Sequence, residues 1–189
     1  LDTPGHVDFS AEMERTLQVL DYAILVINGA DGVQGHTMTL WRLLARYQIP
    51  TFLFINKMDQ DGTDKEKLLA ELKKRLSDNC VDFTWEKSTL QSQFLEDVSV
   101  CDEDLLEKYL ETEEISASDI RKVIKERKLF PCFFGSALKM TGVEEFLHGL
   151  EKYCETPTYP SEFGAKVFKI ARDDQGNRLS YMKITGGNL

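Results

Sequence analysis

The sequence lacks both a long apolar run and a closely spaced set of metal-binding side chains. No run reaches the ~18–20 apolar residues that cross a bilayer, and no signal-peptide pattern opens the sequence, so we expect a cytoplasmic protein with no membrane partner. The cysteines show no CxxC spacing and no histidine companions at the spacing of metal ligands, which disfavours a zinc site. We expect four reduced cysteines that serve in packing: Cys80, Cys101, Cys132 and Cys154.

The sequence also lacks an excess of basic residues. It contains 32 acidic and 23 basic side chains, with a formal net charge of −9. A generalised nucleic-acid-binding surface is therefore not expected, because counterion release needs a basic face. A nucleic-acid partner met through a local patch stays open. The 189 residues suffice for one good core and a small appended piece.

Apolar segments alternate with amphipathic ones along most of the chain. Three runs are apolar throughout, as in strands buried on both faces of a parallel sheet: residues 22–27, 51–55 and 129–134. Helical spacing of apolar residues predicts helices around them, over 6–20, about 36–47, 64–76, 118–127 and from 143 onward. This alternation predicts an α/β fold with a parallel sheet that is covered by helices on both faces.

Residues 77–115 are acidic and show no sustained period, so we expect a small insertion there with a helix near 103–110. Two helix starts carry the spacing of a capping box. Thr63 with Glu66 is expected to cap the helix over 64–76, and Thr141 with Glu144 is expected to cap the last helix.

The pattern of apolar and polar residues changes near residues 155–162. Beyond this point, 164–170 and 179–184 alternate apolar with polar residues around a turn-forming segment, which predicts a β-hairpin. We therefore expect a first domain over residues 1–157 and the opening of a second domain over 158–189.

Asn56-Lys57-Met58-Asp59 directly follows the strand that ends at Ile55. Ligands of open parallel sheets gather at the carboxyl ends of the strands. A carboxylate there can accept hydrogen bonds from N1 and the exocyclic amine of guanine, so Asp59 would select guanine over adenine. Asn56 can bond O6 or N7 of the base, or tie loops together. The stem of Lys57 can lie along the purine face.

Gly135-Ser136-Ala137-Leu138 follows the third apolar run. Such a small-residue turn exposes backbone N–H groups, and the Ala137 N–H can donate to guanine O6. Gly-Ser-Ala is also a common turn, so the segment gains weight from its place after Asn56–Asp59. By contrast, the loop over 28–35 contains three glycines but no Lys-Ser/Thr pair, so it is not expected to cradle phosphate.

The chain opens on Asp2-Thr3-Pro4-Gly5-His6. Asp2 would hold Mg²⁺, through water, because hard cations prefer oxygen ligands. Gly5 can bring its N–H to a γ-phosphate because it has no side chain. His6 could position or polarise an attacking water, and its alternative role is that of a histidine at a helix start.

Together these motifs resemble the GTP-binding domain of translational GTPases. Asp-Thr-Pro-Gly-His-Val-Asp-Phe over 2–9 is similar to the elongation factor G branch in particular. Within that branch, four segments are closer to ribosomal-protection tetracycline-resistance proteins: 56–62, 129–137, 166–170 and 178–181. The interval between Asp59 and Gly135 is shorter than in elongation factor G, which carries a larger subdomain there. The resemblance covers essentially the whole chain, although residues 77–115 contribute little.

This resemblance implies a P-loop-type GTPase domain followed by the start of a β-barrel domain. It implies an enzyme that binds GTP, GDP and Mg²⁺ and acts on the ribosome, near the large-subunit ribosomal RNA. Asp2, Thr3, Pro4, Gly5 and His6 would bind the nucleotide, and His6 would order the attacking water. In the resistance branch, GTP-driven binding lets a distal domain dislodge tetracycline. A housekeeping elongation or release factor and a non-hydrolysing ribosome-binding paralogue are the alternatives.

Two departures from the family pattern affect what we expect of residues 1–189. The phosphate-binding loop GxxxxGK[ST] and the first switch segment are absent, and so is everything beyond the first hairpin of the barrel domain. The chain therefore resembles a fragment of a longer factor, with an intact base site and weak GTP binding. The strand over 22–27 would lie at an exposed sheet edge, through which the fragment could self-associate.

Overall fold

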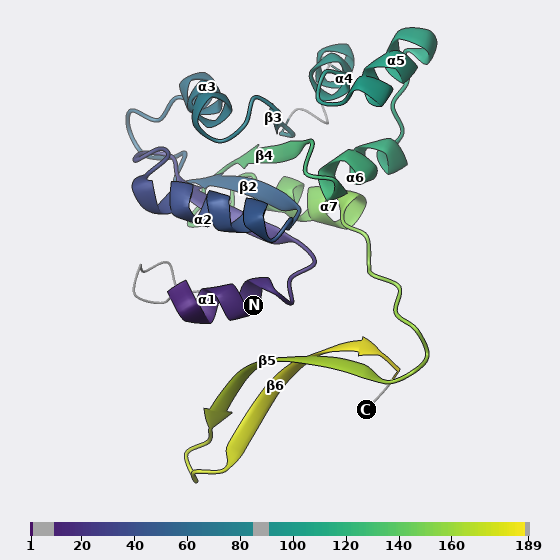
Figure 1. The fold of residues 1–189 in the computed structure, drawn as a ribbon. Helices are drawn as coiled ribbons and strands as arrows, with labels where there is room; N and C mark the ends of the chain where they lie inside the picture. The colour runs from purple at the N-terminus through teal and green to yellow at the C-terminus, as the bar shows by residue number, and fades with distance from the viewer. Residues whose placement is uncertain (2–9, 85–90, 188–189) are drawn as a thin grey trace. The chain divides into compact units, whose positions relative to one another are not determined.

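The computed structural model of the chain describes residues 1, 10–84 and 91–187. These residues form two compact units, each of which is described by itself. The sheet unit comprises Tyr22–Glu155, and the hairpin unit comprises Leu1–Asp21 with Thr156–Leu189. Figure 1 traces the elements of both.

The sheet unit is an α/β fold around a four-stranded parallel sheet, as predicted. Its strands lie in the order β1-β2-β4-β3, and each neighbouring pair is parallel. The strands are β1 (Ala23–Asn28), β2 (Thr51–Asn56), β3 (Cys80–Asp82) and β4 (Phe130–Phe134). The helices are α2 (Gly35–Arg46), α3 (Lys65–Arg75), α4 (Gln91–Ser99), α5 (Glu103–Thr112), α6 (Ala117–Lys125) and α7 (Val143–Tyr153).

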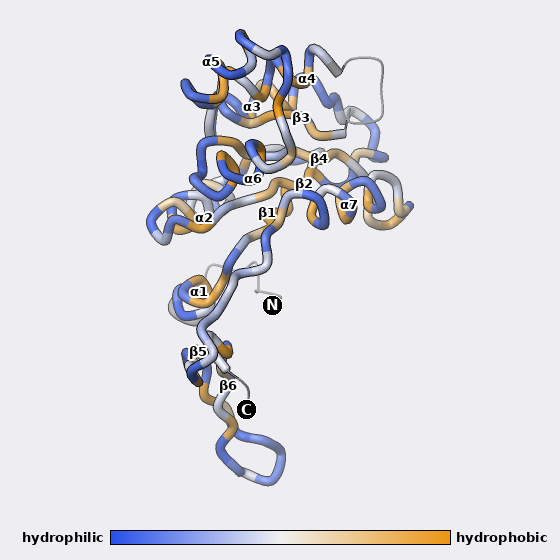
Figure 2. The backbone as a smooth tube through the Cα atoms, turned by 90° about the vertical axis from the view of Figure 1, so that its right-hand side faces the viewer, coloured by the Kyte–Doolittle hydropathy of each residue, from blue (hydrophilic) through white to orange (hydrophobic). Residues whose placement is uncertain are grey.

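Strand β2 lies between β1 and β4, and its residues from Thr51 to Ile55 are all buried. Because successive side chains of a strand point to opposite faces, β2 divides its apolar residues between two cores. Leu53 and Ile55 belong to a cluster that includes Trp41 of α2. Phe52 and Phe54 belong to a second cluster with side chains from α4 to α7. Figure 2 shows hydrophobic stretches along the central strands.

Strand β1 is buried on one face only, which corrects the prediction that both its faces are covered. Leu25 and Ile27 lie in the core, whereas Ile24 is 47% exposed and Val26 is 58% exposed. Leu25 and Ile27 belong to the cluster with Trp41, whereas the second cluster, with Phe52 and Phe54 of β2, includes neither Ile24 nor Val26.

The segment over 77–115 contributes more to the sheet unit than its sequence predicts. The helix expected near 103–110 is present as α5, but β3 and α4 were not predicted. Strand β3 pairs with β4 and completes the sheet, and Phe83, Phe94 and Val98 fill one of the two cores. Cys101 is also buried there, and burial raises the pKa of its thiol to about 12.

Two predicted helix caps are wrong by one residue each. The cap of α3 is Asp64, whose side chain accepts from the Lys67 N–H at 3.1 Å. Thr63 instead donates to the Met58 carbonyl at 2.9 Å, within the preceding turn. The cap of α7 is Gly142, at φ +74°, because Thr141 is engaged in a bridge with Ser136.

Arg127 fastens the amino ends of β2 and β4. Its guanidinium donates to the Ile49 carbonyl and to Thr51 Oγ1, the latter at 3.0 Å. It also lies 5.2 Å from the ring centre of Trp41 and 5.1 Å from that of Phe130. Burial lowers the pKa of Arg127, but the group keeps its charge because its ordinary pKa is so high.

The hairpin unit contains α1 (Ser10–Leu17), β5 (Gly164–Arg172) and β6 (Arg178–Gly186). The predicted hairpin is present, with β5 and β6 antiparallel and a hydrophilic turn between them (Figure 2). Helix α1 ends three residues before the predicted end at Leu20, and the start predicted at His6 lies outside the described residues. Within the described part of the chain, no helix combines the length and apolar character needed to span a bilayer.

Candidate functional site

The candidate base site forms where β2 and β4 end at the same edge of the sheet. Ile55 and Phe134 are paired in register, so the loops that follow them begin side by side. Backbone hydrogen bonds join these loops: Gly135 N–H donates to the Ile55 carbonyl at 2.9 Å, and Met58 N–H donates to the Gly135 carbonyl at 3.0 Å. The structure therefore brings together the two motifs that the sequence places far apart.

Asn56 ties the two loops together with its side-chain oxygen. Asn56 Oδ1 accepts hydrogen bonds from the Lys57 N–H at 2.8 Å and from the Ala137 N–H at 2.9 Å. Lys57 adopts a left-handed backbone conformation, at φ +63°, and its side chain is exposed. Within the described chain, Asn56 Nδ2 has no acceptor. Since amide nitrogen can only donate, Nδ2 is suited to an acceptor such as guanine O6 or N7.

Asp59 is the carboxylate of the site, and its surroundings favour the charged form. A hydrogen bond with the Ser136 side chain is the main cause that lowers the pKa of Asp59, and the neighbouring Lys139 lowers it further. Lys139 Nζ lies 3.5 Å from Asp59 Oδ2. Ser136 is only 3% exposed, so its hydroxyl is held in a fixed place. An ionised Asp59 is a pure acceptor, which suits the N–H donors on the edge of guanine.

The backbone of the second loop offers one donor that is already used and one that is not. The Ala137 N–H, predicted to donate to guanine O6, donates here to Asn56 Oδ1. The Leu138 N–H has no acceptor among the described residues, and Leu138 is 90% exposed. A base could therefore take the Leu138 donor without rearrangement, whereas Ala137 would have to share its hydrogen between two acceptors.

Lys139 was not singled out in the sequence. The sequence shows only that a lysine follows two residues after Ala137, and this spacing does not show which acidic side chain Lys139 will contact. Its pairing with Asp59 depends on the bridge between Ser136 and Thr141, which folds the loop back toward β4.

The opening motif lies outside the described residues. This concerns Asp2, Thr3, Pro4, Gly5 and His6, together with the magnesium ligand predicted at Asp2. In the parts of the chain that are described, no group of three or more His, Cys, Asp or Glu side chains could hold a metal ion. The nucleotide-binding role of the motif stays a prediction.

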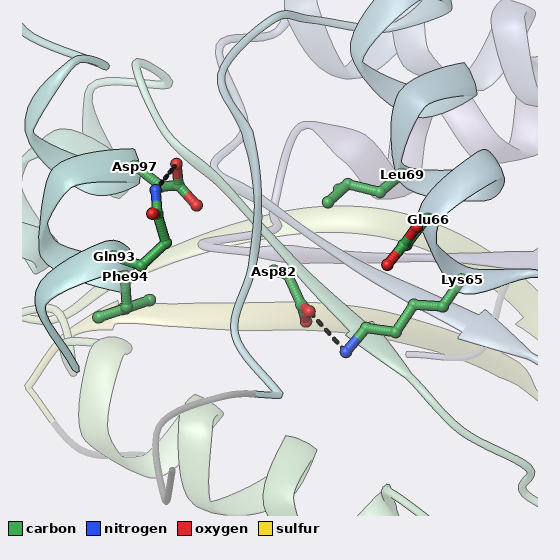
Figure 3. Close-up of a pocket in the computed structure, with 7 residues that line it drawn as sticks. All are labelled: Lys65, Glu66, Leu69, Asp82, Gln93, Phe94 and Asp97. Atoms are coloured by element: carbon green, nitrogen blue, oxygen red, sulfur yellow. Dashed lines mark hydrogen bonds and ion pairs between the residues drawn. The ribbon is translucent and has the colours of Figure 1, made fainter. Parts of the chain in front are cut away.

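A cavity of about 360 Å³ lies apart from this site, between α3 and α4 at the end of β3 (Figure 3). Lys65 forms an ion pair with the buried Asp82 at 2.5 Å. The lining carries three carboxylates and one ammonium group, so it disfavours the phosphates of a nucleotide. Because β3 and α4 were not predicted, no pattern in the sequence pointed to this cavity. The lining residues are Lys65, Glu66, Leu69, Asp82, Gln93, Phe94 and Asp97.

Comparison with known proteins places these loops in a family. The model of the family described as "Elongation factor Tu GTP binding domain" matches residues 1–156. Elongation factor G of Ureaplasma urealyticum serovar 10 is 30% identical over 254 aligned residues, which cover 100% of this chain and 37% of that protein. The tetracycline resistance protein TetM from transposon Tn5251 of Streptococcus pneumoniae is 38% identical over 209 residues, which cover 100% of this chain and 32% of that protein.

A crystal structure of a Thermus thermophilus protein matches 99% of this chain and 35% of its own, with a TM-score of 0.82 and 24% identity. This last similarity concerns the fold alone. The chain thus spans about a third of the length of the relatives that it matches. The family match covers most of the chain, including both loops of the base site, and the fold agrees with it: the chain belongs to the elongation factor Tu GTP-binding domain family.

Proposed function

We propose that the chain binds guanine nucleotides at the carboxyl ends of β2 and β4. The observation that carries this proposal is the division of labour within Asn56, whose oxygen holds the two loops together while its nitrogen stays available to the base. Asp59 would accept from N1 and the exocyclic amine of guanine. The Leu138 N–H, with Ala137 beside it, would donate to O6, and the Lys57 stem would cover the purine face.

Discrimination against adenine follows from the chemistry of Asp59. Adenine presents no pair of N–H donors to this carboxylate, so binding adenine would bury an acceptor without its partners. Competition between GDP and ADP for the full-length protein tests this proposal. We expect GDP to compete at least about 100-fold better, as for sites that hydrogen-bond a polar group of the substrate. Equal competition would overturn it.

We further propose that the full-length protein hydrolyses GTP on the ribosome. Family membership supports this activity, as do the names of the elongation factor G and TetM relatives. Thr3, Pro4 and Gly5 would approach the terminal phosphate and His6 would orient the attacking water. Asp2 would hold Mg²⁺, which would supply charge neutralisation at the phosphates. The large-subunit ribosomal RNA would be the activating partner, and the protein would act in the cytoplasm.

The test is GTP hydrolysis by the full-length protein with and without ribosomes, compared with a His6→Ala variant. We expect ribosomes to stimulate the wild type, and the substitution to reduce the stimulated rate at least about 10-fold while GDP affinity changes little. A stimulated rate that survives the substitution would overturn the role of His6. Binding without any hydrolysis would favour the non-hydrolysing paralogue.

Protection against tetracycline is the more specific function that we propose. It is favoured by the higher identity to TetM, 38% against 30% for elongation factor G. A housekeeping elongation or release factor is the second candidate. Expression of the full-length gene in a tetracycline-sensitive host separates them, because only a protection protein would raise the inhibitory concentration of the drug. An unchanged concentration would favour the housekeeping role.

A further inference from the structure

The loop between β1 and α2 (residues 29–34, the β1–α2 loop) contains two glycines but no phosphate-binding pattern, so its glycines need another explanation. Both polar backbone groups of Val33 in this loop are bonded to side chains of α3. The Val33 N–H donates to Glu71 Oε1 at 3.1 Å, and the Val33 carbonyl accepts from Arg75. Arg75 also donates to Glu71 Oε1 at 3.0 Å, so the two side chains act as one clamp.

Gly32 allows the clamp to approach the backbone. A Cβ at this position would lie 2.5 Å from Glu71 Oε2. The backbone of Gly32 has φ +64°, a conformation that residues with a side chain rarely adopt. Val33 itself is 1% exposed and packs in the core cluster with Trp41. The carboxylate of Glu71 therefore lies directly against the loop, in addition to the hydrogen bonds that Asn28 makes with it.

The other end of the β1–α2 loop rests on the base site. Gly29 N–H donates to the Asn56 carbonyl at 2.7 Å. A Cβ at Gly29 would lie 2.9 Å from the sulfur of Met58 and 3.1 Å from the Asn56 oxygen. The loop thus touches the backbone of the same residue whose side chain joins the two base loops.

We propose that Glu71 and Arg75 are positioning residues for base recognition. They hold Val33, the loop carries this constraint to Gly29, and Gly29 fixes the backbone of Asn56. This chain of contacts fixes the position of Asn56, and through the same loop that of Asp59. The site thereby becomes more selective for guanine. This inference rests on the proposed function of the site, since it concerns how sharply the site recognises its base.

The test compares GDP with inosine diphosphate, which lacks the exocyclic amine from which Asp59 would accept a hydrogen bond. The measured quantity is the ratio of the two dissociation constants for the full-length protein. Glu71→Ala removes the acceptor of the Val33 N–H, and we expect the preference for GDP to fall about 3-fold to 10-fold, as if one net hydrogen bond between Asp59 and the exocyclic amine were weakened or lost. Glu71→Gln keeps an acceptor oxygen and should restore the preference to within about 2-fold of the wild type.

Glu107→Ala is the matched control, because Glu107 is exposed on α5 and forms no ion pair or hydrogen bond within the described residues. It should leave the ratio unchanged. Amide hydrogen exchange of the nucleotide-free protein gives a second measure: Glu71→Ala should speed exchange over 29–34 about 10-fold or more, but not in the buried strand β2.

An unchanged ratio in Glu71→Ala would overturn the proposal even if the melting temperature fell, because a merely structural role moves stability alone. Unchanged exchange over 29–34 would overturn it as well. A wild type that does not distinguish GDP from inosine diphosphate or ADP would instead refute the proposed guanine site. The role of Glu71 in base recognition would then fall with it, and the exchange result would still show whether it holds the loop.

Discussion

Substitution of Asn56 separates the two roles that the structure gives to its side chain. Asn56→Ala removes an oxygen that accepts two backbone N–H groups, at 2.8 and 2.9 Å. A net hydrogen bond contributes about 0.5–1.5 kcal/mol, so the loss should be about 2 kcal/mol. For a domain of this size, that loss lowers Tm by roughly 4–8 °C. Lys57, at φ +63°, would also lose the contact that holds its unfavourable backbone conformation.

Asn56→Asp is the informative companion, because it keeps the acceptor oxygen and replaces the donor nitrogen. We expect this variant to retain most of the stability while its GDP affinity falls at least about 10-fold, since the carboxylate has no donor for the base. Differential scanning calorimetry of the nucleotide-free protein and GDP titration measure the two effects separately. If Asn56→Asp lowers Tm as much as Asn56→Ala, the oxygen does not tie the loops. If it keeps the affinity of the wild type for GDP, Nδ2 does not contact the base.

Three further expectations follow from the described contacts. Because the pKa of Asp59 is lowered in the folded protein, the carboxylate keeps its charge below its ordinary pKa, and GDP binding should be lost only near the lowered pKa. Ser136→Ala removes the main cause of this shift, so the loss of GDP binding should move to higher pH in titrations between about pH 3 and 6. A loss of binding at the same pH as in the wild type would contradict this expectation. Arg127→Met should cost about 2–3 kcal/mol in urea unfolding without changing GDP affinity, because it removes charged hydrogen bonds and the contact with Trp41. Residues 1–189 expressed alone should associate through the edge strand β1, and Val26→Lys should return them to monomers in light scattering; a monomeric parent chain would refute this.

The longer strands of the parallel sheet were predictable because each forms an apolar run of five or six residues, which is long enough to recognise in the sequence. Strand β2 is apolar over most of its length and lies in the middle of the sheet, so pattern and burial agree. Strand β3 has three residues, from Cys80 to Asp82, which is too short for any period. Helix α4 follows it closely with few apolar positions, so neither could be recognised without the neighbours that bury them.

The meeting of the two loops could be predicted from the sequence, but the contacts between them could not. Asn56 and Ala137 could be proposed from their places after two apolar runs, since parallel strands end at one edge. That the Asn56 oxygen accepts the Ala137 N–H depends on the register of Ile55 against Phe134, which no local pattern specifies. The contact of Glu71 with Val33 likewise joins residues 38 positions apart and depends on where α3 packs.

Arg127 and Asn56 fasten β2 and β4 at opposite ends. The Arg127 contacts therefore lie at the end of the strands away from the proposed base site, so stability and nucleotide preference are expected to be separable. Substitutions near the Arg127 end can compensate for a destabilising change at the Asn56 end without touching the base, since distant sites contribute additively. A laboratory selection for altered nucleotide preference should accordingly accept stabilising mutations that lie far from the base loops.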